Sequence, residues 1–142
     1  MTKLQKEIAG WFLYIILSIL LIGSLPKILV FALDSQYPVA SIASSSMWPE
    51  LKQGDLVFIR GAGEIRVGDI VVYQSKKGFT IHRILKIEGE KITTKGDANS
   101  SPDAPIKYDQ IVGKTVNYAG KPMRIPYLGQ ISILLKGKAE NF

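Results

Sequence analysis

Two groups of side chains in this sequence could together carry out nucleophilic chemistry. One is the serine cluster in the segment SSSMWP at positions 44–49, and the other is His82, the only histidine of the chain. A serine hydroxyl is a weak nucleophile until a base removes its proton, and a neutral imidazole can take that proton and return it to a leaving group. Because the chain has one histidine, a serine–histidine mechanism has no other candidate for the base. Taken alone, a serine cluster before a proline is more typical of a turn, and a lone histidine of a structural role.

Two aspartates could orient the imidazole. Asp97 lies in the segment KGDAN (95–99), and Asp103 ends the segment SPD (101–103). An aspartate that accepts a hydrogen bond from the far ring nitrogen selects the tautomer and stabilises the imidazolium that forms. Asp97 could equally be the acidic residue of a turn, as we expect for Asp55 and Asp69, which also follow glycines. These residues by themselves leave the choice between the two aspartates open.

A long apolar segment precedes all of these residues. Residues 9–25 carry no charge, and after Pro26 and Lys27 the apolar run continues to residue 33. A spanning helix needs about 20 mostly apolar residues, and Trp11 and Tyr14 lie near one end, where interfacial aromatic residues are expected. We therefore expect a transmembrane anchor over residues 9–33. One alternative is a buried core helix, for which so small a domain lacks an interior; another is a cleaved signal peptide, whose apolar core is usually shorter.

The charges that flank the anchor predict its orientation. Lys3 and Lys6 precede it with Glu7 as the acidic residue between them and the apolar run, so the positive-inside rule places residues 1–8 in the cytoplasm. Residues 34–142 are then extracytoplasmic, in a single-pass protein of the cell membrane. Lys27 either extends to the outer headgroups or marks the end of the span, with residues 28–33 along the interface.

Beyond residue 34 the hydrophobic pattern changes from continuous to alternating. Short runs rich in β-branched residues predict strands at 39–44, 56–60, 69–74, 79–89, 91–95 and 110–120. Clusters rich in glycine, aspartate and asparagine separate them and favour tight turns. The segment YLGQISILL (127–135) is too short for a second span and predicts a last strand or a membrane-contacting edge. The predicted fold class is mainly β, with one N-terminal transmembrane helix followed by an antiparallel β catalytic domain.

Composition excludes several other function classes. The chain has no cysteine, so it can form neither a disulfide nor a thiolate metal site, and it has no histidine cluster for zinc and no glycine-rich phosphate loop. We therefore expect no metal and no organic cofactor. The net charge of +6 comes from lysines spread along the sequence, which suits anionic lipid headgroups better than nucleic acid.

Five short motifs follow one another along the chain, and their order is similar to that of the motifs in one protein family. They are S-x-S-M-x-P (44–49), G-D-L-V (54–57), V-G-D-I-V-V (67–72), H-R-I (82–84) and K-G-D-x-N (95–99). In this order behind an N-terminal span, they resemble type I signal peptidase, and the resemblance extends from the anchor to about Leu128. Bacterial members typically have Lys-Arg where this chain has His82 and Arg83, so the chain resembles the archaeal and endoplasmic-reticulum branch.

The resemblance implies a role for each candidate residue. Ser46, directly before Met47, would be the nucleophile and His82 its base. The backbone N–H of Ser46 and the hydroxyl of Ser44 would form the oxyanion hole. In eukaryote-like members the triad partner is the acidic residue six positions after the Gly-Asp aspartate. That residue is Asp103 here, which leaves Asp97 to shape the neighbouring loop or to assist.

The resemblance also implies an activity, that of a signal peptidase I. This is a membrane-bound serine endopeptidase that removes signal peptides from secreted preproteins at the outer membrane face. The substrate would bind extended along a strand edge, with small residues at the first and third positions before the cut. The expected partners are signal-peptide-bearing preproteins and the lipid bilayer, with the protein-export channel as a further candidate.

Two alternatives remain open at this point. The first is a serine–lysine protease of the same fold, in which Lys86 or Lys95 is the base and His82 is structural. The second is a membrane-tethered β module that binds a partner and has no catalytic turnover. Replacement of His82 separates the first from a serine–histidine enzyme, and replacement of Ser46 separates the second.

Overall fold

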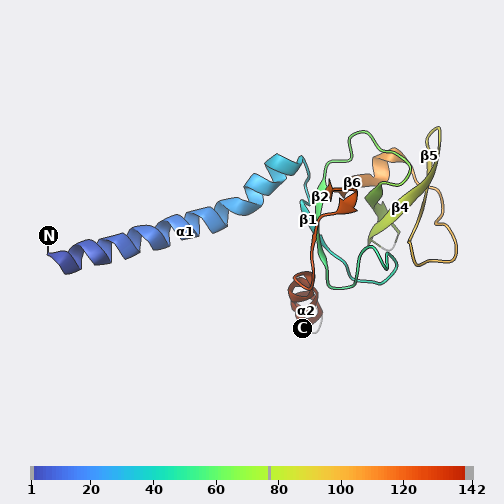
Figure 1. Cartoon of the computed structure of the whole chain (residues 1–142). Coiled ribbons are helices and arrows are strands. Elements are labelled where there is room, and N and C mark those ends of the chain that lie inside the picture. Colours follow the sequence, from blue (N-terminus) through green and yellow to red (C-terminus); the bar gives the residue numbers. More distant parts are fainter. Residues whose placement is uncertain (1, 77, 140–142) are drawn as a thin grey trace.

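The computed structural model describes residues 2–76 and 78–139, which form one long helix and a β domain (Figure 1). Helix α1 (Lys3–Leu33) begins with a capping box between Thr2 and Gln5 and ends at Asp34, whose backbone is left-handed. It is long and apolar enough to cross a membrane. No residue of α1 is buried, so the helix is not the core helix of a soluble fold.

Helix α1 continues through Pro26, where the sequence had suggested an interruption. Figure 1 shows that the helix bends before its C-terminal end, as expected when a proline removes one backbone hydrogen bond. At 1.5 Å per residue its 31 residues measure about 46 Å, which exceeds the roughly 30 Å of a hydrocarbon core. At least one end of α1 therefore extends beyond the apolar layer of a bilayer that it spans.

An antiparallel sheet, whose strands differ in length, forms the centre of the β domain. Its strands are β1 (Val39–Ser41), β2 (Leu56–Arg60), β3 (Ile70–Ser75), β4 (Gly78–Glu88), β5 (Lys91–Lys95), β6 (Ile111–Thr115) and β9 (Arg124–Ile125). The spatial order is β1-β2-β6-β3-β4-β5, and β9 pairs with β2. The 3-10 helix η1 (Tyr108–Gln110) directly precedes β6. A small hairpin of β7 (Asn117–Tyr118) and β8 (Lys121–Pro122) follows β6. The predicted fold class, an apolar helix followed by an antiparallel β domain, is confirmed.

Most predicted strands agree with the structure to within a residue, and three segments differ. The first strand ends at Ser41 and not at residue 44, because the chain leaves the sheet there to enter the serine cluster. The segment 110–120 divides between η1, β6 and β7. The tail at 127–135 was predicted as a last strand or a membrane-contacting edge; the strand is wrong, because Gly129–Ala139 is a helix, α2, and the membrane contact stays a prediction. Leucine, glutamine, lysine and alanine favour a helix, and the alternation of Ile131 and Ile133 was too short to outweigh them.

The core consists of two apolar clusters on opposite faces of the sheet. One cluster contains Ile42, Met47, Leu51, Val57, Ile59, Ile70 and Val72; the other contains Val71, Tyr73, Ile84, Ile92, Ile106 and Ile111. The neighbours Val71 and Val72 belong to different clusters, as side-chain alternation along a strand requires. His82 pairs with Val71 across β3 and β4, so it lies on the face of the second cluster.

Candidate active site

The serine cluster is held by a buried side chain next to it. Met47 and Leu51 are fully buried, and the Leu51 N–H donates to the Met47 carbonyl at 2.9 Å. Met47 therefore packs in the core and is not available to a membrane interface or a substrate. Trp48, in contrast, is 56% exposed. Anchoring Met47 in the core determines where Ser46, the preceding residue, presents its hydroxyl.

Ser46, His82 and Asp103 form a continuous line of contacts. The Nε2 atom of His82 lies 3.1 Å from the Ser46 Oγ, and its Nδ1 atom lies 2.6 Å from the Asp103 Oδ2. The imidazole belongs to β4 and is 7% exposed. Both distances are within hydrogen-bond reach, and the ring stands between a hydroxyl and a carboxylate, which is the arrangement required of a nucleophile, a base and an orienting acid.

The Asp103 carboxylate has two further contacts, which sequence reasoning missed. Its Oδ2 atom accepts hydrogen bonds from the Thr94 hydroxyl at 2.8 Å and from the Tyr73 hydroxyl at 3.1 Å. The Asp103 backbone N–H also donates to the Thr94 carbonyl at 2.8 Å. One sequence signal existed: Tyr73 places a hydroxyl within the apolar run of β3, and a buried tyrosine hydroxyl usually has a partner.

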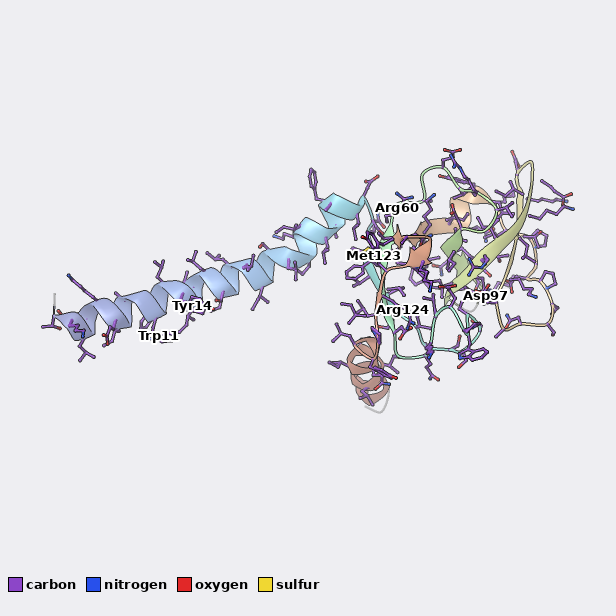
Figure 2. All side chains as sticks on the ribbon, viewed as in Figure 1. Trp11, Tyr14, Arg60, Asp97, Met123 and Arg124 are labelled. Carbon is purple, nitrogen blue, oxygen red and sulfur yellow. The ribbon has the colours of Figure 1, made fainter. Side chains whose placement is uncertain are left out.

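Asp97 is paired with Arg83 and has no contact with His82. The Arg83 Nε and Nη2 atoms donate to its two carboxylate oxygens at 2.9 and 2.7 Å, and the Arg83 Nη2 lies 3.8 Å from a Glu50 oxygen. The hydrogen bond with Asp97 raises the pKa of Arg83. Figure 2 shows Asp97 in the β domain, well separated from Trp11 and Tyr14 on α1. Of the two candidate aspartates, the structure thus brings Asp103 to the imidazole and Asp97 to the guanidinium.

The loop that contains Asp97 packs directly on the serine. A Cβ atom built on Gly96 would lie 2.6 Å from the Ser46 carbonyl oxygen and 2.9 Å from the His82 Nε2. The Ala98 N–H donates to the same Ser46 oxygen at 2.9 Å. Only a residue without a side chain therefore leaves room for the contact between hydroxyl and imidazole.

The second serine of the predicted oxyanion hole is close to the first. The Oγ atoms of Ser44 and Ser46 are 3.2 Å apart, and Ser44 is exposed. An exposed hydroxyl beside the nucleophile can donate to an oxyanion that forms there, together with the N–H of Ser46.

The two lysines considered as alternative bases have other surroundings. The Lys86 Nζ lies 2.7 Å from the Glu88 carboxylate in an exposed ion pair. Lys95 pairs with Arg83 between β4 and β5, so alternation places it on the face opposite to His82. Within residues 2–76 and 78–139, no group of three metal-binding side chains is found.

An apolar groove of about 320 Å³ runs along β1 as far as Ala43, the residue before the serine cluster. It is bounded by β1 and Ala43 on one side and by Phe79 of β4 and Ile133 of α2 on others. Its walls can accommodate an extended, apolar segment of chain.

Comparison with known proteins places this chain in a family. The sequence profile described as Peptidase S24-like matches residues 21–116, which include every candidate residue of the site. The chain belongs to the Peptidase S24-like family. The profile covers the end of α1 and the β domain as far as β6, so the family match and the line of contacts concern the same part of the chain.

Similar proteins carry a more specific name. The signal peptidase complex catalytic subunit sec11 of Sclerotinia sclerotiorum is 36% identical over 121 residues, covering 73% of this chain and 67% of that protein. The SEC11 catalytic subunit of Verticillium alfalfae is 34% identical over 119 residues, covering 72% and 66%. That of Lachancea thermotolerans is 32% identical over 118 residues, covering 70% and 67%. The chain spans about two thirds of each relative. These similarities confirm the predicted membership of the archaeal and endoplasmic-reticulum branch of signal peptidases.

Proposed function

We propose that this chain is a membrane-anchored serine endopeptidase that removes signal peptides from secreted preproteins, with Ser46 as nucleophile, His82 as general base and Asp103 as the orienting acid. The observation that carries the proposal is the line of contacts from the Ser46 Oγ through the imidazole to the Asp103 carboxylate, at 3.1 and 2.6 Å. The substrate class is supported by relatives that are named signal peptidase complex catalytic subunits.

The reaction follows from this geometry. The Nε2 atom of His82 takes the proton of Ser46 as the Oγ attacks the scissile carbonyl carbon. The resulting oxyanion accepts hydrogen bonds from the Ser46 N–H and the Ser44 hydroxyl, while Asp103 stabilises the imidazolium. The C–N bond then breaks as the imidazolium gives its proton to the leaving amine. Water, activated by the same imidazole, hydrolyses the acyl-enzyme and regenerates Ser46.

The groove beside β1 is the proposed binding site for the residues before the cut. A peptide that runs along β1 as an added strand directs alternate side chains into the groove, and it reaches the serine cluster past Ala43.

Helix α1 supplies the proposed membrane anchor, with its N-terminal flank in the cytoplasm and the β domain on the outer face of the membrane. At the endoplasmic reticulum the equivalent face is the lumenal one. Anchoring confines enzyme and preprotein to one plane, which raises their effective concentration. In sealed, right-side-out membrane vesicles, added protease should degrade the β domain and spare a tag placed before α1. Protection of the β domain would contradict this orientation.

The test of the chemistry is cleavage of a signal-peptide-bearing preprotein in detergent. Ser46→Ala and His82→Ala should each lower kcat by about 10⁶-fold, and Asp103→Asn by about 10⁴-fold, with unfolding temperatures close to wild type. Asp97→Asn should cost less, because the Asp97 carboxylate contacts Arg83 and not the imidazole.

Lys86→Ala and Lys95→Ala are the matched controls and should keep wild-type turnover. Activity retained in His82→Ala and lost in one of these lysine variants would favour the serine–lysine protease. A Ser46→Ala protein that keeps its biological role would favour the non-catalytic binding module.

A further inference from the structure

We propose that Tyr73 and Thr94 are positioning residues that hold the Asp103 carboxylate against His82, an inference that rests on the function proposed above. Neither hydroxyl touches Ser46 or the bond to be cleaved. Both act on the reaction only through the carboxylate and the imidazole that it orients.

One oxygen atom of Asp103 accepts hydrogen bonds from three donors. Its Oδ2 lies 2.6 Å from the His82 Nδ1, 2.8 Å from the Thr94 Oγ1 and 3.1 Å from the Tyr73 Oη. Each hydroxyl has a single hydrogen to donate. The Thr94 oxygen is closer to the carboxylate than to the Tyr73 oxygen, which is 3.3 Å away. The shorter contacts assign both hydroxyl protons to Asp103.

The three donors come from three adjacent strands. Tyr73 is on β3, His82 on β4 and Thr94 on β5, and their pairing (Tyr73 with Thr80, Thr94 with Ile84) places all three side chains on one face of the sheet. Asp103 itself lies in the connection after β5, outside any strand. The two hydroxyls therefore attach a carboxylate from a loop to the sheet that carries the imidazole.

Water cannot take the place of these donors. Thr94 is fully buried and Tyr73 is 3% exposed. Burial raises the pKa of Tyr73, so its hydroxyl remains a neutral donor at the pH where the enzyme works. The Asp103 side chain is 24% exposed, which leaves it an open side toward solvent. Without the hydroxyls, the carboxylate can turn to that side and lose its alignment with the His82 Nδ1.

The carboxylate charge is also shared among the three donors. A serine–histidine–aspartate mechanism requires the proton taken from Ser46 to stay on the imidazole, and a carboxylate held against the His82 Nδ1 stabilises that imidazolium. Positioning and charge stabilisation thus come from the same two hydroxyls.

Removal of each hydroxyl tests the proposal in the full-length chain in detergent. Tyr73→Phe and Thr94→Val should each lower kcat for preprotein cleavage by about tenfold, with KM close to wild type, since substrate does not contact either residue. Thr94→Ser keeps the hydroxyl and should restore most of the turnover lost in Thr94→Val. The matched control is Thr115→Val, which removes a buried hydroxyl bonded to Asn117 away from the site and should leave kcat unchanged.

A spectroscopic readout separates positioning from a general loss of stability. His82 is the only histidine, so selective ¹⁵N-histidine labelling gives the signals of this one ring. The proton on Nδ1, bonded to a carboxylate at 2.6 Å, should resonate far downfield in the wild type. It should move upfield or vanish in Tyr73→Phe and Thr94→Val but not in Thr115→Val.

Wild-type turnover in both single variants would overturn the proposal. So would a loss of turnover with the Nδ1 proton signal unchanged, since the hydroxyls would then not act through the imidazole. Failure of the proposed function looks different: Ser46→Ala would then cleave preprotein as the wild type does, whatever the Tyr73 and Thr94 variants show.

Discussion

Ser46 and His82 are 36 positions apart in the sequence, and the loop that crosses beside them leaves no room for a side chain at position 96. Gly96 has an ordinary backbone conformation, so glycine is required there by close approach and not by a left-handed turn. The Ala98 N–H, two residues later, fixes the Ser46 carbonyl from the same loop. At the scale of single residues, the absence of a side chain at Gly96 is therefore as necessary to the site as the presence of the hydroxyl.

Gly96→Ala should disable the site without removing any reactive group. Its methyl group would meet the Ser46 carbonyl at 2.6 Å and the His82 Nε2 at 2.9 Å, so the serine and the ring must separate. A displacement of this size should cost about 100-fold or more in kcat for preprotein cleavage.

Gly23→Ala, in α1 where a methyl group meets nothing within 4 Å, is the control and should cleave normally. A Gly96→Ala protein with wild-type kcat would show that the loop can move away from Ser46 at little cost.

At the scale of elements, the C-terminal strand is attached to the sheet by an ion pair. The Arg124 Nη1 on β9 lies 2.6 Å from the Asp55 Oδ2, and the Lys52 N–H donates to the same oxygen at 2.9 Å. Asp55 is 2% exposed. It is thus the turn residue that the sequence predicted and also the anion for a distant strand. Figure 2 shows Arg124 and Met123 on the edge of the domain along which the chain passes to α2.

Arg124→Met should destabilise the β domain by about 3 kcal/mol, because it leaves the buried Asp55 carboxylate without its cation. Urea or thermal unfolding of the purified protein measures the change. Arg66→Met removes an arginine from an exposed pair with Glu64 and should leave the unfolding midpoint unchanged. Equal midpoints for the two variants would mean that the ion pair between Arg124 and Asp55 contributes little to the stability of the fold.

At the scale of the whole molecule, anchor and catalytic domain are structurally separate. No residue of α1 is buried, whereas the β domain has apolar clusters on both faces of its sheet. The junction consists of backbone hydrogen bonds such as that from the Gly61 N–H to the Leu33 carbonyl at 2.9 Å. Figure 1 shows the helix projecting away from the domain. The domain therefore has the core that it needs to fold without the helix.

A protein that begins at Asp34 should unfold at nearly the same temperature as the full chain and should cleave a soluble signal-peptide fragment at a similar rate. Its cleavage of a preprotein embedded in vesicles should fall by about 100-fold or more, because the anchor no longer confines both partners to one plane. Equal rates on vesicles would show that α1 contributes nothing to the encounter. An unfolded truncated protein would show that the two parts are not separate.

Patterns over a few residues were enough to predict the apolar helix and most of the strands. Burial alternates along β2 and β5, and both strands have the predicted bounds. The strand predicted as one alternative for residues 127–135 was wrong, because helix-favouring residues there form α2. Local pattern determines an element only where it is long enough to outweigh the competing propensity.

The sequence by itself left a serine–histidine mechanism with a single candidate base, the imidazole of His82, because the chain has no second histidine, and its motifs indicated the family by their order. Only the tertiary structure decided which carboxylate meets that imidazole. It places Asp103 at His82 and Asp97 at Arg83, and it adds the hydroxyls of Tyr73 and Thr94. These contacts depend on strand pairing and on the path of the loop after β5. Such long-range geometry is set by packing across the whole sheet, so the spacing of residues along the chain does not contain it.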